Sequence, residues 1–304
     1  MPHSGADSLA APTRLDAILI VVAVCGVSFS GPLMAATAAP ALAIAFWRNA
    51  LGGGASLAAV LLRRREELRA LRWRAFGVVG LAGLALSLHF ATWVPSVTMT
   101  SVASATALVA TQTIFVALIG QVRGRGAARA AWLGIAVSTA GTVLVTGADV
   151  GLSGRALVGD LLAVLGGLFA AIYVTIGAHV RQQMTTMVYT SVCYAVCAVL
   201  LLGACLVGGV RLGGFAGGAW LKIALVTVCA QLLGHSLINV VLRSTSPTVV
   251  SLAILFETPG AAIVAAAWLH QSPPLLAIPG MLLLLAGVVV VVRARGSDGP
   301  VDID

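Results

Sequence analysis

The sequence predicts an all-α integral membrane protein of ten transmembrane helices, because its composition suits lipid and not water. Hydrophobic residues make up 60% of the 304 residues and charged residues only 9%, whereas soluble domains carry about 25% charged residues. The mean hydropathy is +1.05. A spanning helix needs roughly 20 apolar residues. Ten apolar segments of that length, joined by short connections, account for nearly the whole chain.

The predicted helices follow a polar tail, residues 1–13, which is rich in Ser, Ala and Pro. The first apolar segment is long for a signal peptide, and only Arg14 precedes it, so we interpret it as a retained helix. Each later segment is an apolar run of spanning length. The ten segments are residues 15–36, 40–62, 74–95, 100–121, 128–147, 157–179, 186–208, 219–242, 247–269 and 275–293.

The distribution of basic residues predicts the orientation. With the N-terminus inside, the inner connections and tails hold Arg14, Arg63, Arg64, Arg65, Arg69, Arg72, Arg74, Arg123, Arg125, Arg129, Arg181, Arg243, Arg293 and Arg295. The outer connections hold only Arg155, Arg211 and Lys222. Because cytoplasmic loops carry an excess of Lys and Arg, we expect both termini in the cytoplasm, an even number of helices, and a location in the inner (cytoplasmic) membrane.

An internal repeat divides the chain at an offset of 146 residues. The segment WLGIAVSTAGTVLV (132–145) aligns with IPGMLLLLAGVVVV (278–291), and the same offset places His89 on His235. We therefore expect a first five-helix repeat over residues 14–148, a second over 149–295, and a cytoplasmic C-terminal tail over 296–304. Since five is odd, the second repeat would enter the membrane from the opposite side, an arrangement typical of secondary transporters.

Two segments resemble the drug/metabolite transporter superfamily, in particular its EamA-type carriers with ten helices. They are AIAFWRNALGGGASLAAVLL in the second helix, with Arg48, and the run NVVLRSTSPTVVSLAILFETPGAAIVAAAWLHQ (239–271), with Pro259. The sequence departs from the family pattern at Thr113, which stands where the second repeat has Pro259, and at Gln271, which replaces an acidic residue. The resemblance implies a carrier of small metabolites, such as amino acids or related amphipathic compounds, often an exporter, that works by alternating access around a midplane cavity.

Two charged residues within predicted helices are the first candidates for a substrate site. Glu257 lies about 11 residues into the ninth helix, roughly 16 Å from its inner end, and Arg48 lies at a similar depth. Because a bare charge is costly there, Glu257 is either a proton carrier or counter-charge for a substrate amine, or a bonded structural acid. Arg48 either clamps a substrate carboxylate, extends to the outer interface of the membrane, or forms a structural pair, for which Glu257 is a candidate partner.

Further candidates are polar or aromatic residues near these two charges. His89 and His235 occupy equivalent positions in the repeats and either line the cavity or are bonded core histidines. Aromatic rings can stack on a cationic or aromatic ligand, although most such rings only fill space. Buried amides can line the path or hold helices together. These aromatic and amide candidates are Trp47, Trp93, Tyr173, Phe256, Asn239 and Gln112.

Composition also limits the partners and cofactors. The net charge of +8 comes from arginines beside apolar segments and not from an exposed basic face, so we expect the lipid bilayer and a small-molecule substrate as partners and no nucleic acid. Protons are a candidate coupling ion, and the protein could be a monomer or a homodimer. The chain has no Walker-type phosphate loop and no metal-ligand cluster, so we expect no cofactor and no enzymatic activity. A membrane-embedded lipid-modifying enzyme and a non-transporting partner subunit remain the alternatives.

Overall fold

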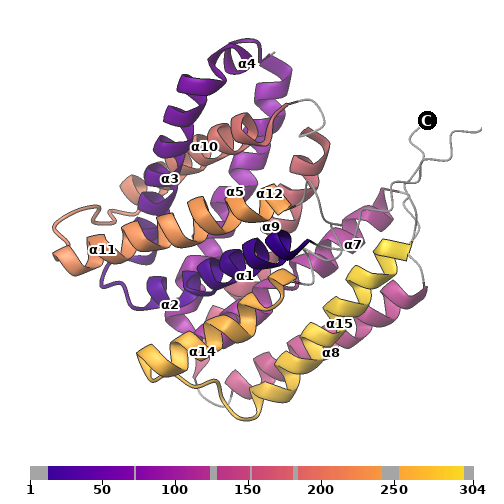
Figure 1. The fold of residues 1–304 in the computed structure, drawn as a ribbon. Helices are drawn as coiled ribbons and strands as arrows, with labels where there is room; N and C mark the ends of the chain where they lie inside the picture. The colour runs from indigo at the N-terminus through magenta and orange to yellow at the C-terminus, as the bar shows by residue number, and fades with distance from the viewer. Residues whose placement is uncertain are drawn as a thin grey trace, which may run out of the picture.

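A computed structural model describes residues 13–71, 73–123, 129–150, 153–180, 184–241 and 253–297 of the chain. All regular secondary structure in these ranges is helical (Figure 1). In the first half the helices are α1 (Arg14–Ser28), α2 (Ser30–Ala35), α3 (Ala41–Arg63), α4 (Arg65–Arg69), α5 (Trp73–Met99), α6 (Val102–Val109), α7 (Gln112–Val122) and α8 (Arg129–Val150). In the second half they are α9 (Gly154–Val180), α10 (Thr186–Val207), α11 (Gly217–Val226), the π-helix η1 (Thr227–Gly234), α12 (His235–Val241), α14 (Glu257–Leu269) and α15 (Ala277–Ser297).

Eight helical segments among the described residues are long and apolar enough to cross a membrane, namely Arg14–Ala35, Trp73–Met99, Val102–Val122, Arg129–Ala148, Gly154–Gly177, Thr186–Val207, Gly217–Gly234 and Ala277–Ala294. The predicted segments 40–62 and 247–269 are not among them. The first is the 23-residue helix α3, which carries Arg48 within its length, and part of the second lies outside the described residues. The protein is a multi-pass helical membrane protein, and the number ten stays a prediction.

Four of the predicted continuous helices are interrupted within the described residues. The first breaks at Phe29, between α1 and α2. Pro32 explains this break, because proline has no N–H to bond the carbonyl four residues earlier and its ring clashes with that carbonyl. The eighth changes from α-helix to the π-helix η1 and back. By contrast, Pro95 lies inside α5, which continues through it.

The third interruption occurs in the fourth helix of the first half, between α6 and α7 at residues 110 and 111. The Thr111 hydroxyl donates to the Leu108 carbonyl at 2.6 Å, a local bond that competes with the helical ladder. The fourth lies in the second half, where turn residues 255 and 256 precede α14, close to the 146-residue offset from this break. There Pro259 removes the ladder bond to Leu255. The two halves therefore break at matching places for different chemical reasons.

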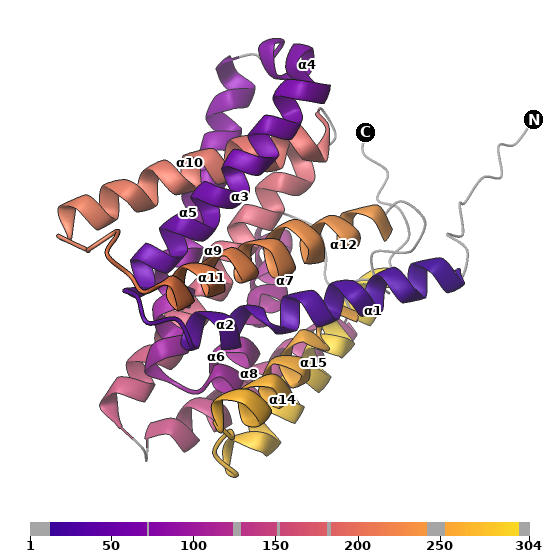
Figure 2. The same ribbon diagram turned by 60° about the vertical axis from the view of Figure 1, so that its left-hand side comes forward.

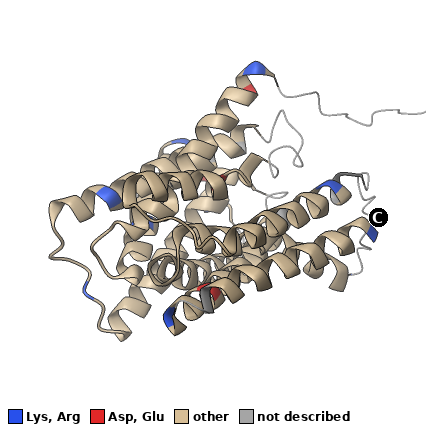
Figure 3. Ribbon diagram, turned by 90° about the horizontal axis from the view of Figure 1, so that it is seen from below, with Lys and Arg blue, Asp and Glu red and all other residues tan. Residues whose placement is uncertain are grey.

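Helices of the two halves pack against each other throughout the bundle. Figures 1 and 2 show α8 beside α15, and α15 packs on α8, α5 on α9, and α3 on α10. The packing is also reciprocal, since α5 lies on the first helix of the second half and α1 lies on η1 and α12. Figure 3 shows most of the ribbon in tan, with the blue arginines and lysines mainly near helix ends. The polar residues inside the bundle therefore stand out as candidates for function.

Candidate functional site

Arg48 lies at the centre of the described polar residues, and only 2% of its surface is exposed. It is carried by α3, next to Gly52 and Gly53, where small residues let other helices come close. Its guanidinium lies over the Phe90 ring of α5, 4.5 Å from the centroid. Its hydrogen bonds go to Gln231 Oε1 (3.3 Å), Ser30 Oγ (3.4 Å) and Met34 Sδ (3.6 Å). All of these partners are uncharged. The positive charge of Arg48 is therefore stabilised by the dipoles of neutral groups and by the face of the Phe90 ring.

The π-helix η1 places Gln231 against Arg48. A π-helix contains an extra residue per turn and is frequently found at functional sites. Gln231 is 3% exposed, and its Nε2 has no hydrogen-bond partner within the described part of the chain. A Cβ atom on Gly52 would lie 2.5 Å from this nitrogen, so the approach of Gln231 requires glycine at position 52. Gln231 thus offers a buried donor beside a buried cation.

His89 is fixed by a carbonyl and two rings. Its Nδ1 lies 3.0 Å from the Gly166 carbonyl oxygen of α9. Because a carbonyl only accepts, Nδ1 carries the proton in this bond. The ring stacks on Trp93 (5.6 Å between centroids, 15° between planes) and lies 4.8 Å from Phe90. Phe90 therefore contacts both the imidazole and the Arg48 guanidinium.

Glu257 and His235 complete a group of four ionisable side chains. Glu257 is the first residue of α14, directly after the break, and is half-buried. His235 begins α12 and its side chain is exposed. Arg48 lies within electrostatic range of Tyr194 and Cys197 of α10, of Glu257 and of both histidines. The two histidines lie within electrostatic range of each other. Arg48, His89, His235 and Glu257, which we call the central group, come from α3, α5, α12 and α14.

The direct ion pair suggested for Arg48 and Glu257 is not formed in this conformation. The contacts of the guanidinium are all with neutral groups. Glu257 is instead placed by its helix, because Thr258 donates to the Thr106 carbonyl of α6 at 3.4 Å. The broken fourth helices of the two halves, α6 and α14, are therefore in contact beside Glu257. The Arg48 guanidinium and the Glu257 carboxylate can each still bind another partner.

The other predicted site residues are scattered around the bundle. Trp93 is buried and joins the central group through His89. Trp47 donates its Nε1–H to the Leu212 carbonyl at 2.8 Å and packs edge-on against Trp220, so it braces the connection before α11. Tyr173 stacks on Tyr189, between α9 and α10.

Two further predicted residues, Phe256 and Gln112, make no contact with the central group among the described residues, and the side chain of a third, Asn239, lies outside them. Phe256 is 67% exposed. Gln112 begins α7 and is half-buried. Asn239 lies in α12.

Sequence reasoning missed three uncharged partners of Arg48, which are Ser30, Met34 and Gln231. Gln231 had a usable signal, since it is an amide in an apolar segment and precedes His235 by four residues, which places both on one helix face. Asn49 was also missed. It is fully buried, and its Oδ1 has no partner within the described ranges. Nothing in the sequence indicated that Ser30 and Met34 would contact Arg48, because these contacts depend on how α2 packs after the break at Phe29.

Comparison with known proteins agrees with this architecture. A solved structure described as "Crystal structure of protein" has a TM-score of 0.64 with this chain at 16% identity, covering 91% of this chain and 96% of its own. At that identity the likeness shows the fold alone. No curated protein sequence matches the chain. The EamA-like transporter family matches it twice, over residues 14–147 and 157–293. Because these two ranges span nearly all of the helical sequence, the chain belongs to the EamA-like transporter family.

Proposed function

We propose that this protein is a secondary carrier that exports small metabolites bearing a carboxylate, such as amino acids or related amphipathic compounds. The observation that carries the proposal is the buried Arg48, surrounded by neutral partners and within electrostatic range of one carboxylate and two histidines. A guanidinium binds a carboxylate through two parallel hydrogen bonds. Its present partners are weak enough for a substrate carboxylate to replace.

Glu257 supplies the second charge that an amino acid requires. Its carboxylate can receive a substrate ammonium while Arg48 receives the substrate carboxylate, so a zwitterion would neutralise both charges at once. Ionisable residues at membrane depth are generally functional. Glu257 also begins a helix after a break, and discontinuous helices at midplane depth form the substrate sites of many transporters. Proton exchange at the same carboxylate is part of the proposal.

The contact between α8 and α15 supports alternating access by two inverted repeats. A Cβ on Gly134 would lie 2.7 Å from the Gly287 carbonyl oxygen, and a Cβ on Gly141 would lie 2.7 Å from that of Gly280. Gly134 and Gly141 correspond to Gly280 and Gly287 at the 146-residue offset, so the contacts are exchanged between the repeats. Ser138 Oγ donates to the carbonyl of Leu284, its own equivalent, at 3.1 Å. This is the pattern expected of a two-fold axis between antiparallel helices.

The proposal is tested by exchange of labelled amino acids in proteoliposomes made with the purified protein. Glu257→Gln keeps the shape of the side chain and removes its charge, so we expect counterflow to collapse or to lose its dependence on pH. Glu66→Gln changes an exposed carboxylate of α4 and should transport normally. Normal, pH-dependent transport by Glu257→Gln would show that this carboxylate is not part of the site.

The substrate itself is sought by thermal unfolding in the presence of amino acids, amines, nucleobases and sugars, since a ligand of the folded state raises its apparent stability. We expect amino acids to stabilise the protein and amines lacking a carboxylate to do so less. Stabilisation by sugars or nucleobases alone would contradict the substrate class. Absence of transport for every class would count against a carrier.

A further inference from the structure

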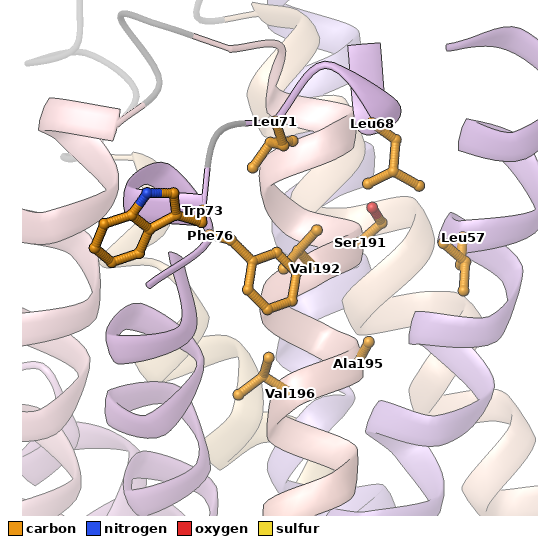
Figure 4. Close-up of a pocket in the computed structure, with 9 residues that line it drawn as sticks. All are labelled: Leu57, Leu68, Leu71, Trp73, Phe76, Ser191, Val192, Ala195 and Val196. Carbon is orange, nitrogen blue, oxygen red and sulfur yellow. The ribbon is translucent and has the colours of Figure 1, made fainter. Parts of the chain in front are cut away.

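An apolar groove is lined by residues of α3, α4, α5 and α10 (Figure 4). Its volume is about 530 Å³, within the roughly 300–1,000 Å³ typical of ligand sites. Its walls include Leu57 of α3, Leu68 of α4, Phe76 of α5, and Val192 and Val196 of α10. Leu57 is nine residues beyond Arg48 on α3, a rise of about 13 Å. No residue of the central group lines the groove, so it is a separate site.

The chemistry of the groove excludes a polar metabolite. Ser191 is its one lining residue with a polar side chain apart from the indole of Trp73. The Ser191 hydroxyl is buried and already donates to the Val188 carbonyl at 2.9 Å. A polar ligand would therefore lose its hydration without gaining hydrogen bonds. An alkyl chain makes no such demand.

The mouth of the groove is strongly basic. Residues 63–74, which connect α3 to α5 through α4, contain six arginines and two glutamates. Among the described residues Arg63, Arg64, Arg65, Arg69 and Arg74 are exposed. Arg74 places its guanidinium 5.5 Å from the ring centroid of Trp73, a lining residue that is itself 79% exposed.

One of the two glutamates is occupied elsewhere. Glu67 accepts hydrogen bonds from the Thr185 backbone N–H at 2.6 Å and from the Thr185 hydroxyl at 3.0 Å. This contact ties α4 to the start of α10. It also fixes Leu68, which follows Glu67, over the groove (Figure 4). With six arginines against two glutamates, residues 63–74 keep a net charge of +4.

We propose that this groove binds one anionic phospholipid of the bilayer, with an acyl chain against α3, α5 and α10 and the phosphate on the five described arginines, Arg63, Arg64, Arg65, Arg69 and Arg74. Charge complementarity selects this occupant, because basic clusters beside a spanning helix attract anionic lipid headgroups. An exposed Trp at the helix end is typical of the level at which those headgroups lie. The alkyl chain and the phosphate of one molecule satisfy the apolar walls and the basic mouth together.

The test measures binding of phosphatidylglycerol to the purified, delipidated full-length protein in detergent, by thermal unfolding and by native mass spectrometry. We expect one retained phosphatidylglycerol per chain and a higher melting temperature than with equal phosphatidylcholine. Soluble glycerol phosphate should give no shift. The double variant Arg69→Gln/Arg74→Gln should weaken binding about 30-fold, and Ala195→Phe should fill the groove and abolish binding.

Matched controls separate the groove from general effects. Arg293→Gln removes an exposed arginine of α15, and Ala136→Phe adds a ring to an exposed position of α8; both should bind phosphatidylglycerol as the wild type does. Equal stabilisation by phosphatidylcholine, an equal shift with glycerol phosphate, or unchanged binding by the double arginine variant would overturn the proposal. The double variant decides the question even if Ala195→Phe does not fold.

Discussion

At the scale of the residue, the most informative feature is that the charged side chain of Arg48 is buried inside the bundle. A buried charge is tolerated only where hydrogen bonds or paired charges replace its lost hydration. Here two oxygens, a sulfur and the face of Phe90 do so. Neutral partners lower the cost of burial without cancelling the charge, which leaves the guanidinium able to attract an anion.

The geometry of the guanidinium gives a first prediction. Arg48→Lys keeps the charge but loses the planar fork that binds a carboxylate through two bonds. We expect the affinity for a carboxylate substrate to fall at least about tenfold while folding is kept, as measured by substrate-induced thermal stabilisation. Arg293→Lys at an exposed site should bind normally. Undiminished affinity in Arg48→Lys would mean that the fork does not hold the substrate.

A neighbouring glycine gives a second prediction. Gly52→Ala places a methyl group 2.5 Å from Gln231 Nε2 and 2.8 Å from its Cδ, so Gln231 must move away from Arg48. Because the contacted atoms are the end of a flexible side chain that can rotate away, we expect a loss of only about 1 kcal/mol in the free energy of unfolding, from the lost hydrogen bond to Arg48. Gly54→Ala is the matched control, because nothing lies within 4 Å of its new Cβ and alanine favours a helix by up to about 1 kcal/mol. A harmless Gly52→Ala would contradict the close contact.

At the scale of the element, interruptions decide what each helix presents to the interior. The turn before α14 makes Glu257 the first residue of a new helix, where the helix dipole favours a carboxylate. The π-helix η1 turns Gln231 toward α3. Glycine acts between elements, since α8 and α15 approach closely enough for their backbones to touch at four glycine positions.

The seam between α8 and α15 gives a third prediction. A Cβ on Gly141 would collide with the backbone of Leu284 and Gly280, which cannot yield as a flexible side chain does. Gly141→Ala should therefore cost about 1–3 kcal/mol of unfolding free energy. Gly147→Ala lies on the same helix with open space around it and should cost nothing. Melting temperatures in detergent compare the two, and equal values would argue against this seam.

At the scale of the whole molecule, the bundle is organised by helices of one half packing against helices of the other. Equivalent helices pair across the halves in α8–α15 and α3–α10, and the contact of α5 with α9 has its counterpart in that of α1 with η1 and α12. In a carrier built in this way, rearrangement of one half against the other would expose a central site to each side in turn. The distribution of arginines predicts the orientation of the bundle in the membrane, and it puts the basic mouth of the proposed lipid groove on the cytoplasmic side.

The orientation gives a fourth prediction. Single cysteines are introduced into a variant without native cysteines, and intact cells are treated with a membrane-impermeant maleimide. Ser153→Cys and Gly213→Cys, both at exposed connections, should be labelled from outside. Arg64→Cys and Arg123→Cys, also exposed, should be labelled only after the membrane is opened. Labelling of Arg64→Cys in intact cells would reverse the predicted orientation.

The sequence by itself determined that the chain lies in lipid, most of its helical segments and its division into two matching halves. It also singled out the four ionisable residues of the central group as candidates. These follow from local properties, because a charge within an apolar segment is costly wherever that segment packs. Tertiary structure decided that Gln231, Ser30 and Met34 hold Arg48 and that Trp47 packs away from them against Trp220. It also brought the four residues within electrostatic range of one another and formed the groove beneath α4. Those outcomes depend on which helices come close, and close approach is set by backbone breaks and glycine contacts between distant segments.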